Sequence, residues 1–136
     1  MMQNNDDMIK QLLEIAKKAS SMAYAPYSNF CVGAALFTEK GSIYSGCNVE
    51  NASYSLSSCA EKNAIFSAVS AEGSQMKIKM IVIVTNKGLP APPCGACRQV
   101  IAEFSNKTKT EIIFHTKEGI VRKKINELLP DVFELE

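Results

Sequence analysis

The chain has 136 residues, of which 46% are hydrophobic and 21% are charged, and its 15 basic residues nearly balance its 14 acidic ones. This length is typical of one globular domain, so we expect residues 1–136 to form a single domain with a flexible segment at residues 1–5. The charge balance argues against a nucleic-acid surface, and the absence of a long apolar run argues against a membrane span.

The N-terminus is polar and acidic, which is not typical of an export signal. Five cysteines is an odd number, so a disulfide framework is not expected. The better interpretation is that the thiols are reduced, in the cytoplasm, and that at least three of them are ligands of a metal.

The first third of the chain predicts a helix followed by a β-hairpin. Apolar residues at helical spacing predict an amphipathic helix over residues 6–23. The almost wholly apolar run 30–37 predicts a strand, residues 39–42 a turn, and residues 43–47 the returning strand.

The middle of the chain predicts two further helices around a buried strand. A helix is expected over residues 59–71, where Gly73 would end it. Residues 80–84 are the kind of short apolar run found in strands that are buried on both faces. A loop rich in glycine and proline, residues 88–93, then leads to a helix over residues 94–104.

The last part of the chain predicts two strands, at residues 111–115 and 120–121, and a short helix near residues 128–129. Helices that alternate with short apolar strands indicate an α/β sandwich with a mixed sheet. The sequence contains no repeat and no linker.

Two short segments carry the most reactive side chains. Cys59 and Glu61 lie in the first, and Cys94 and Cys97 in the second. Three cysteine ligands would leave the fourth corner of a zinc tetrahedron open, which is typical of catalytic sites. Each segment begins a predicted helix, whose dipole would lower the pKa of the thiols. Glu61 would then reach the space beside the metal, where it could act as a proton carrier.

Each segment also has a simpler interpretation. Ser58 and Glu61 fit a capping box, and a Cys-x-x-Cys pair can be redox-active or structural. The two segments together favour a catalytic site. The remaining candidate side chains lie in apolar or strand-like surroundings and are predicted to be structural: Cys31, Cys47 and His115.

With these motifs in view, the chain resembles the small, homotetrameric cytidine deaminases, from about residue 25 to residue 133. The zinc deaminases share the two cysteine segments and the glutamate that is not a ligand. The further matching segments are residues 25–30, 32–36, 46–52, 98–99 and 127–130.

The resemblance implies a three-layer α/β/α sandwich around a mixed, roughly five-stranded sheet, and one zinc ion per subunit. It also implies hydrolytic deamination of cytidine and deoxycytidine to uridine and deoxyuridine, with release of ammonia, in pyrimidine salvage. The expected partners are a nucleoside substrate and further copies of the chain, in a homotetramer whose active sites are shared between subunits.

The resemblance also assigns roles to single residues. Phe30 would stack on the pyrimidine, the backbone amide of Ala60 would bind the base carbonyl, and Asn48 and Glu50 would bind the ribose hydroxyls. Two further aromatics would help complete the site of a neighbouring subunit: Tyr54 and Phe133.

One residue departs from the family pattern, because Lys62 stands where the family usually has arginine. Lysine keeps the positive charge beside three thiolates but lacks the planar fork that can address two sulfur atoms. We therefore expect Lys62 to tune the charge of the zinc site, with activity retained.

Two other functions stay open from the sequence. One is deamination of a cytosine-nucleoside antibiotic, as in the blasticidin deaminases, and the other is a non-catalytic, zinc-stabilised binding module. Asn48 and Glu50 favour a ribose, and Glu61 favours catalysis. The pattern does not rank cytidine against deoxycytidine.

Overall fold

The computed structural model describes residues 5–135. Asn5 already begins the first helix, and the rest of the segment that we expected to be flexible, residues 1–4, lies outside the described residues. In chain order the elements are α1 Asn5–Ser20, β1 Val32–Thr38, β2 Ile43–Cys47, the 3₁₀ helix η1 Tyr54–Leu56, α2 Ala60–Glu72, β3 Ile78–Thr85, α3 Gly95–Glu103, β4 Glu111–Thr116, β5 Gly119–Lys123 and α4 Ile125–Leu128.

The strands form one five-stranded sheet in the order β2-β1-β3-β4-β5. The β3–β4 pair is parallel, and the other three pairs are antiparallel. The predicted mixed sheet is therefore confirmed. Residues 80–85 of the central strand β3 are all buried, as expected of a strand that is covered on both faces.

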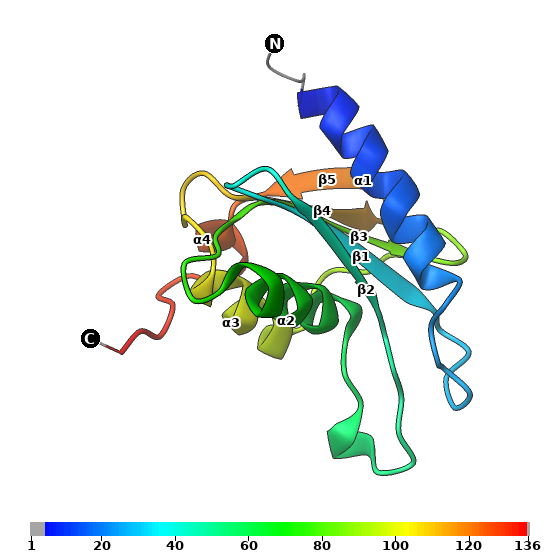
Figure 1. Cartoon of the computed structure of the whole chain (residues 1–136). Coiled ribbons are helices and arrows are strands. Elements are labelled where there is room, and N and C mark those ends of the chain that lie inside the picture. The colour runs from blue at the N-terminus through cyan, green and yellow to red at the C-terminus, as the bar shows by residue number, and fades with distance from the viewer. Residues whose placement is uncertain (1–4, 136) are drawn as a thin grey trace.

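The helices cover both faces of the sheet (Figure 1). Helix α1 packs on one face, where its Leu12 and Ala16 share an apolar cluster with Val82 of β3. Helices α2 and α3 pack on the other face, where their buried residues form a second cluster with Ile81 and Ile83. The side chains of successive β3 residues thus pack on opposite faces of the sheet. The predicted three-layer sandwich is confirmed.

Two glycines allow the helices to lie very close to the sheet. A Cβ atom at Gly33 would lie 1.9 Å from the carbonyl oxygen of Ala16 in α1. A Cβ atom at Gly46 would lie 2.5 Å from the backbone nitrogen of Ala64 in α2. Any side chain at Gly46 would therefore push away the helix whose first turn follows Cys59.

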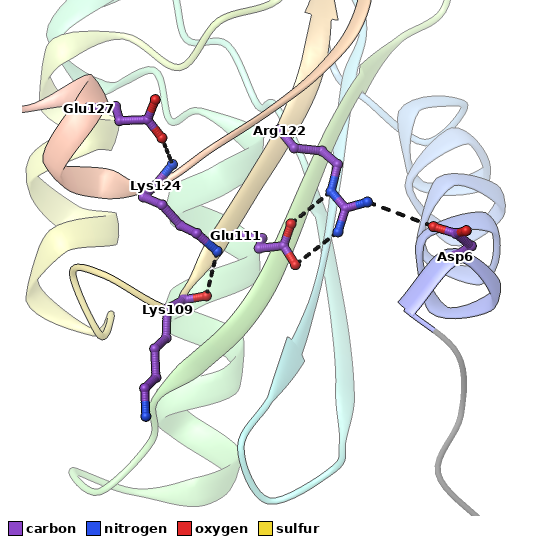
Figure 2. A network of polar contacts seen from close by, with 6 residues as sticks. All are labelled: Asp6, Lys109, Glu111, Arg122, Lys124 and Glu127. Atoms are coloured by element: carbon purple, nitrogen blue, oxygen red, sulfur yellow. Dashed lines mark hydrogen bonds and ion pairs between the residues drawn. The ribbon is translucent and has the colours of Figure 1, made fainter.

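A network of ion pairs joins α1 to the far edge of the sheet (Figure 2). Arg122 on β5 donates from Nε and Nη2 to the two carboxylate oxygens of Glu111 on β4, at 2.8 and 3.0 Å. The Nη1 atom of Arg122 lies 3.7 Å from a carboxylate oxygen of Asp6 in α1. This bidentate pair lowers the pKa of Glu111, mainly through the hydrogen bonds from Arg122.

The segment between β2 and α2 projects beyond the sheet (Figure 1). Its base is closed by two backbone hydrogen bonds between Val49 and Ser58, at 3.0 and 2.9 Å. The projecting part carries η1, which the sequence did not predict. No helix within residues 5–135 has both the length and the apolar character that are needed to cross a bilayer.

Candidate active site

Three cysteine thiols meet where two helices begin. Cys59 is the N-cap of α2, and Cys94 is the N-cap of α3. Cys97 lies in the first turn of α3, and its backbone N–H donates to the Sγ atom of Cys94 at 3.4 Å. The three sulfur atoms all lie within 4.8 Å of one another, and they belong to the one group of this kind found between residues 5 and 135.

The acid–base properties of this thiol cluster fit a bound cation. A hydrogen bond with Cys97 lowers the pKa of Cys59 to about 6, whereas the same contact and burial raise the pKa of Cys97. Cys59 is therefore more easily ionised than Cys97, and three adjacent thiolates would require a positive ion between them.

The donor set also fits zinc in particular, because thiolate is the soft ligand that zinc prefers. Zn–S bonds of about 2.3 Å in a tetrahedron place the sulfur atoms roughly 3.8 Å apart. That spacing lies within the 4.8 Å limit of the cluster. Cys59, Cys94 and Cys97 would therefore hold the ion without a change of fold.

Glu61 is the second residue of α2 and lies beside the thiol cluster. Its side chain is only 5% exposed, and burial raises the pKa of its carboxyl group. A raised pKa suits a group that must both take and return a proton near neutral pH.

The simpler interpretation of Glu61 as part of a capping box is wrong. Cys59, and not Ser58, is the N-cap of α2, and no side chain caps it. The hydroxyl of Ser58 donates instead to the side-chain oxygen of Asn63, at 2.8 Å. Glu61 thus forms no capping box with Ser58.

A cavity of about 290 Å³ opens beside the thiol cluster. Of the residues that the resemblance singled out, Phe30, Asn48 and Ala60 line it together with Glu61. Apolar residues that the sequence did not single out complete its walls: Val32, Ile83, Pro90, Ala91 and Pro92. Its size lies near the lower end of the roughly 300–1,000 Å³ that small-molecule sites occupy.

The side-chain amide of Asn48 holds the backbone around Phe30. Its Oδ1 atom accepts from the N–H of Val32, and its Nδ2 atom donates to the carbonyl of Phe30, both at 2.8 Å. Because Asn48 directly follows β2, the amide ties this strand end to the segment that enters β1.

Glu50 lies in a second pocket, of about 280 Å³, which Tyr27, Ser28 and Tyr54 also line. Its carboxylate accepts from the backbone N–H groups of Tyr27 and Ser28, at 3.0 and 3.2 Å, and from the Ser28 hydroxyl. These bonds, the hydroxyl first among them, lower the pKa of Glu50. Glu50 is therefore ionised at neutral pH.

The two aromatics assigned to a neighbouring site lie outside the cavity of the thiol cluster. Tyr54 in η1 is 80% exposed, and its ring meets Tyr27 edge to face, with the centroids 6.5 Å apart. Phe133 is 68% exposed and lines a separate cavity of about 410 Å³ beside α3. Neither ring meets the thiols within one chain.

Lys62 follows Glu61 in α2 and is half-buried. Its positive charge is one of the causes that lower the pKa of Cys59, although hydrogen bonds from Cys97 and Cys94 contribute more. Cys31 and Cys47 are not members of the thiol cluster. His115 lies in β4, where its backbone carbonyl accepts from the N–H of Ala91 at 3.0 Å.

Comparison with known proteins gives consistent similarities. Residues 6–115 match the family model of the cytidine and deoxycytidylate deaminase zinc-binding region. The chain is 45% identical over 128 residues to the cytidine deaminase of Sporosarcina psychrophila. This match covers 94% of this chain and 93% of the relative. It is 43% identical over 128 residues to the cytidine deaminase of Halalkalibacterium halodurans, covering 93% of this chain and 95% of the relative.

Solved structures agree with these sequence matches. The cytidine deaminase of Burkholderia pseudomallei superposes with a TM-score of 0.82 at 46% identity, over 91% of this chain and 98% of that one. The enzyme of Mycobacterium tuberculosis superposes with a TM-score of 0.81 at 34% identity, over 98% of this chain and 100% of that one.

Proposed function

The chain belongs to the cytidine and deoxycytidylate deaminase family, and we propose that it deaminates both cytidine and deoxycytidine as free nucleosides. Its activity is the zinc-dependent hydrolytic deamination of cytidine. The observation that carries this conclusion is a cluster of three thiols beside a cavity that the buried Glu61 lines. These comparisons do not favour an antibiotic deaminase or a non-catalytic zinc module.

Glu61 is proposed to move the protons of the reaction. Zinc held by Cys59, Cys94 and Cys97 would supply a Lewis acid that lowers the pKa of water. Overall, water adds to the carbon that bears the amine, the C–N bond breaks, and uridine and ammonia are formed. Glu61 takes the proton of the water and delivers it to ring nitrogen 3, and then carries a second proton to the departing amine.

Two groups are proposed to place the base against Glu61. Phe30 stacks on the pyrimidine, and its half-buried position at the cavity supports this role. The backbone N–H of Ala60 binds the base carbonyl, because Ala60 is the first residue of α2 and such N–H groups lack a partner within the helix.

The proposed sugar contacts explain why both nucleosides would be accepted. A carboxylate has roughly four positions that accept a hydrogen bond. Tyr27 and Ser28 already fill three such positions on Glu50. Asn48 likewise has one N–H left beside its bond to Phe30. Together they suit one hydroxyl, which donates to Glu50 and accepts from Asn48, and both sugars carry such a hydroxyl.

An ultraviolet assay tests the proposed substrates. Purified protein should convert cytidine and deoxycytidine at comparable kcat/KM, within about tenfold of each other, because one shared hydroxyl is bound. A zinc chelator should abolish both conversions, and added zinc should restore them. Conversion of cytidine with deoxycytidine untouched would contradict the single-hydroxyl proposal.

A substitution at Lys62 tests its proposed role at the zinc site. In Lys62→Arg, the planar guanidinium can donate to two sulfur atoms and so withdraw charge from the thiolates. A metal with less negative ligands is the stronger Lewis acid. We expect retained activity and an acid limb of the pH–kcat profile that moves to lower pH by up to about one unit.

The control for this profile is Lys40→Arg, which changes an exposed lysine in the turn between β1 and β2. The pH–kcat profile of Lys40→Arg should match that of the unmodified enzyme. Superimposable profiles for Lys62→Arg and the unmodified enzyme would show that Lys62 does not tune the site.

We further propose that the chain acts as one deaminase domain in a cytoplasmic homotetramer with shared active sites. The free cysteines support a reducing compartment. The strong exposure of Tyr54 and Phe133 supports shared sites, because large exposed aromatics often mark interfaces.

Mixing two inactive or weakened variants tests the shared sites. Phe133→Ala should lower kcat/KM by roughly tenfold, and Glu61→Gln should remove turnover. Tetramers assembled from both should regain activity, since some sites would combine an intact Glu61 with Phe133 of the partner subunit. If the activity of the mixture equalled the sum of the separate variants, shared sites would be contradicted. The tetramer itself is tested by light scattering, which should give about four times the mass of one chain.

A further inference from the structure

Ser28 lies between the residue assigned to the sugar and the residue assigned to the base. Its hydroxyl donates to the carboxylate of Glu50 and accepts from the backbone N–H of Phe30, the latter at 3.0 Å. The backbone N–H of Ser28 also donates to Glu50, at 3.2 Å. One short side chain therefore contacts both Glu50 and the backbone that carries the Phe30 ring.

The backbone between Ser28 and Phe30 is sharply turned. Asn29 has a φ angle of 56°, in the left-handed region that asparagine adopts more readily than most residues other than glycine. Such a conformation persists where the flanking residues are held in place. Here the hydroxyl of Ser28 holds the N–H of Phe30, and Asn48 holds its carbonyl at 2.8 Å.

Both backbone polar groups of Phe30 are thus tied to the residues assigned to the sugar. The carbonyl is tied to Asn48 directly, and the N–H is tied to Glu50 through Ser28. We propose that Ser28 is a positioning residue that couples recognition of the sugar hydroxyl to the placement of the Phe30 ring over the base. This inference rests on the proposed roles of Glu50 and Phe30.

The charge of Glu50 supports this coupling. Its carboxylate is ionised at neutral pH, and the hydrogen bond from the Ser28 hydroxyl is the main cause of its lowered pKa. An ionised acceptor binds a hydroxyl donor more strongly than a neutral one does. A sugar hydroxyl on Glu50 would then fix the carboxylate, Ser28 and the Phe30 backbone together. Base placement would improve, and the rate depends steeply on such placement.

A comparison of two substrates tests the coupling. Cytidine carries the hydroxyl that is proposed to bind Glu50 and Asn48, whereas 2′,3′-dideoxycytidine lacks it. In Ser28→Ala, we expect kcat/KM for cytidine to fall about tenfold, with changes in both kcat and KM. For the dideoxy substrate we expect a loss of less than about threefold, because its hydroxyl contact is already absent.

Two further variants separate this role from a structural one. Ser28→Thr keeps the hydroxyl at an exposed position and should restore both constants. Ser21→Ala removes an exposed hydroxyl that donates to the carbonyl of Lys18 at the end of α1, and it should behave as the unmodified enzyme. Zinc content and melting temperature should be unchanged in all three variants.

Several results would overturn the inference. They are an equal loss for both substrates in Ser28→Ala, no loss for either, or no recovery in Ser28→Thr. Failure of the proposed function would look different, because the unmodified enzyme would then not convert cytidine at all.

Discussion

Glu61→Gln is expected to lower kcat for cytidine by about a thousandfold while zinc stays bound. Glutamine has nearly the same shape but cannot take or release a proton, and positioned acid–base groups contribute roughly 10²–10⁴ in rate. Glu61 is 5% exposed and is not part of the thiol cluster. Its replacement should therefore leave the three ligands and their metal in place.

The measurement combines steady-state kinetics with metal analysis by mass spectrometry. Glu118→Gln is the matched control, because it makes the same chemical change at an exposed residue between β4 and β5. The control should keep the kcat and zinc content of the unmodified enzyme. If Glu61→Gln deaminated cytidine at the native rate, the assignment of the proton carrier would be wrong.

Most of the fold could be predicted because the local patterns were strong. The return strand of the hairpin was expected at residues 43–47 and is observed as Ile43–Cys47. Helix α1 ends at Ser20, three residues before its predicted end. The hydroxyls of Ser20 and Ser21 donate back to the carbonyls of Lys17 and Lys18 there, which favours a turn.

The short helix η1 had no such local pattern. Its residues Tyr54 and Leu56 are exposed, so no periodic burial marks the segment in the sequence. Val32 of β1 and Ile83 of β3 face the same side as α2, but both strands are almost wholly apolar, so no alternation in the sequence marks that side. Only the fold shows that this side holds the cavity.

The thiol cluster was predictable because its ligands lie at helix starts at short spacings. The interactions of Asn48 and Glu50 could not be predicted in this way, because they join residues that are distant in sequence. Asn48 holds Phe30 from 18 positions away, and Glu50 holds Ser28 from 22 positions away. The sequence suggested sugar contacts for both residues, but it gave no sign that they also fix the backbone of the base-binding ring.

Cys97→Ala is expected to remove both zinc binding and activity. Cys97 is fully buried in the first turn of α3, so no solvent-exposed side chain can take its place as a ligand. Loss of one of three thiolates removes a strong Zn–S bond. We expect turnover to fall to background and zinc to be lost on dialysis.

A thermal measurement makes this prediction independent of turnover. A ligand that binds only the folded state raises stability by RT ln(1 + [L]/Kd). Added zinc should therefore raise the melting temperature of the metal-free unmodified enzyme but not that of Cys97→Ala. Cys31→Ala deletes an equivalent sulfur outside the cluster and should respond to zinc as the unmodified enzyme does. If Cys97→Ala kept zinc and this thermal response, as Cys31→Ala should, Cys97 would not be a ligand.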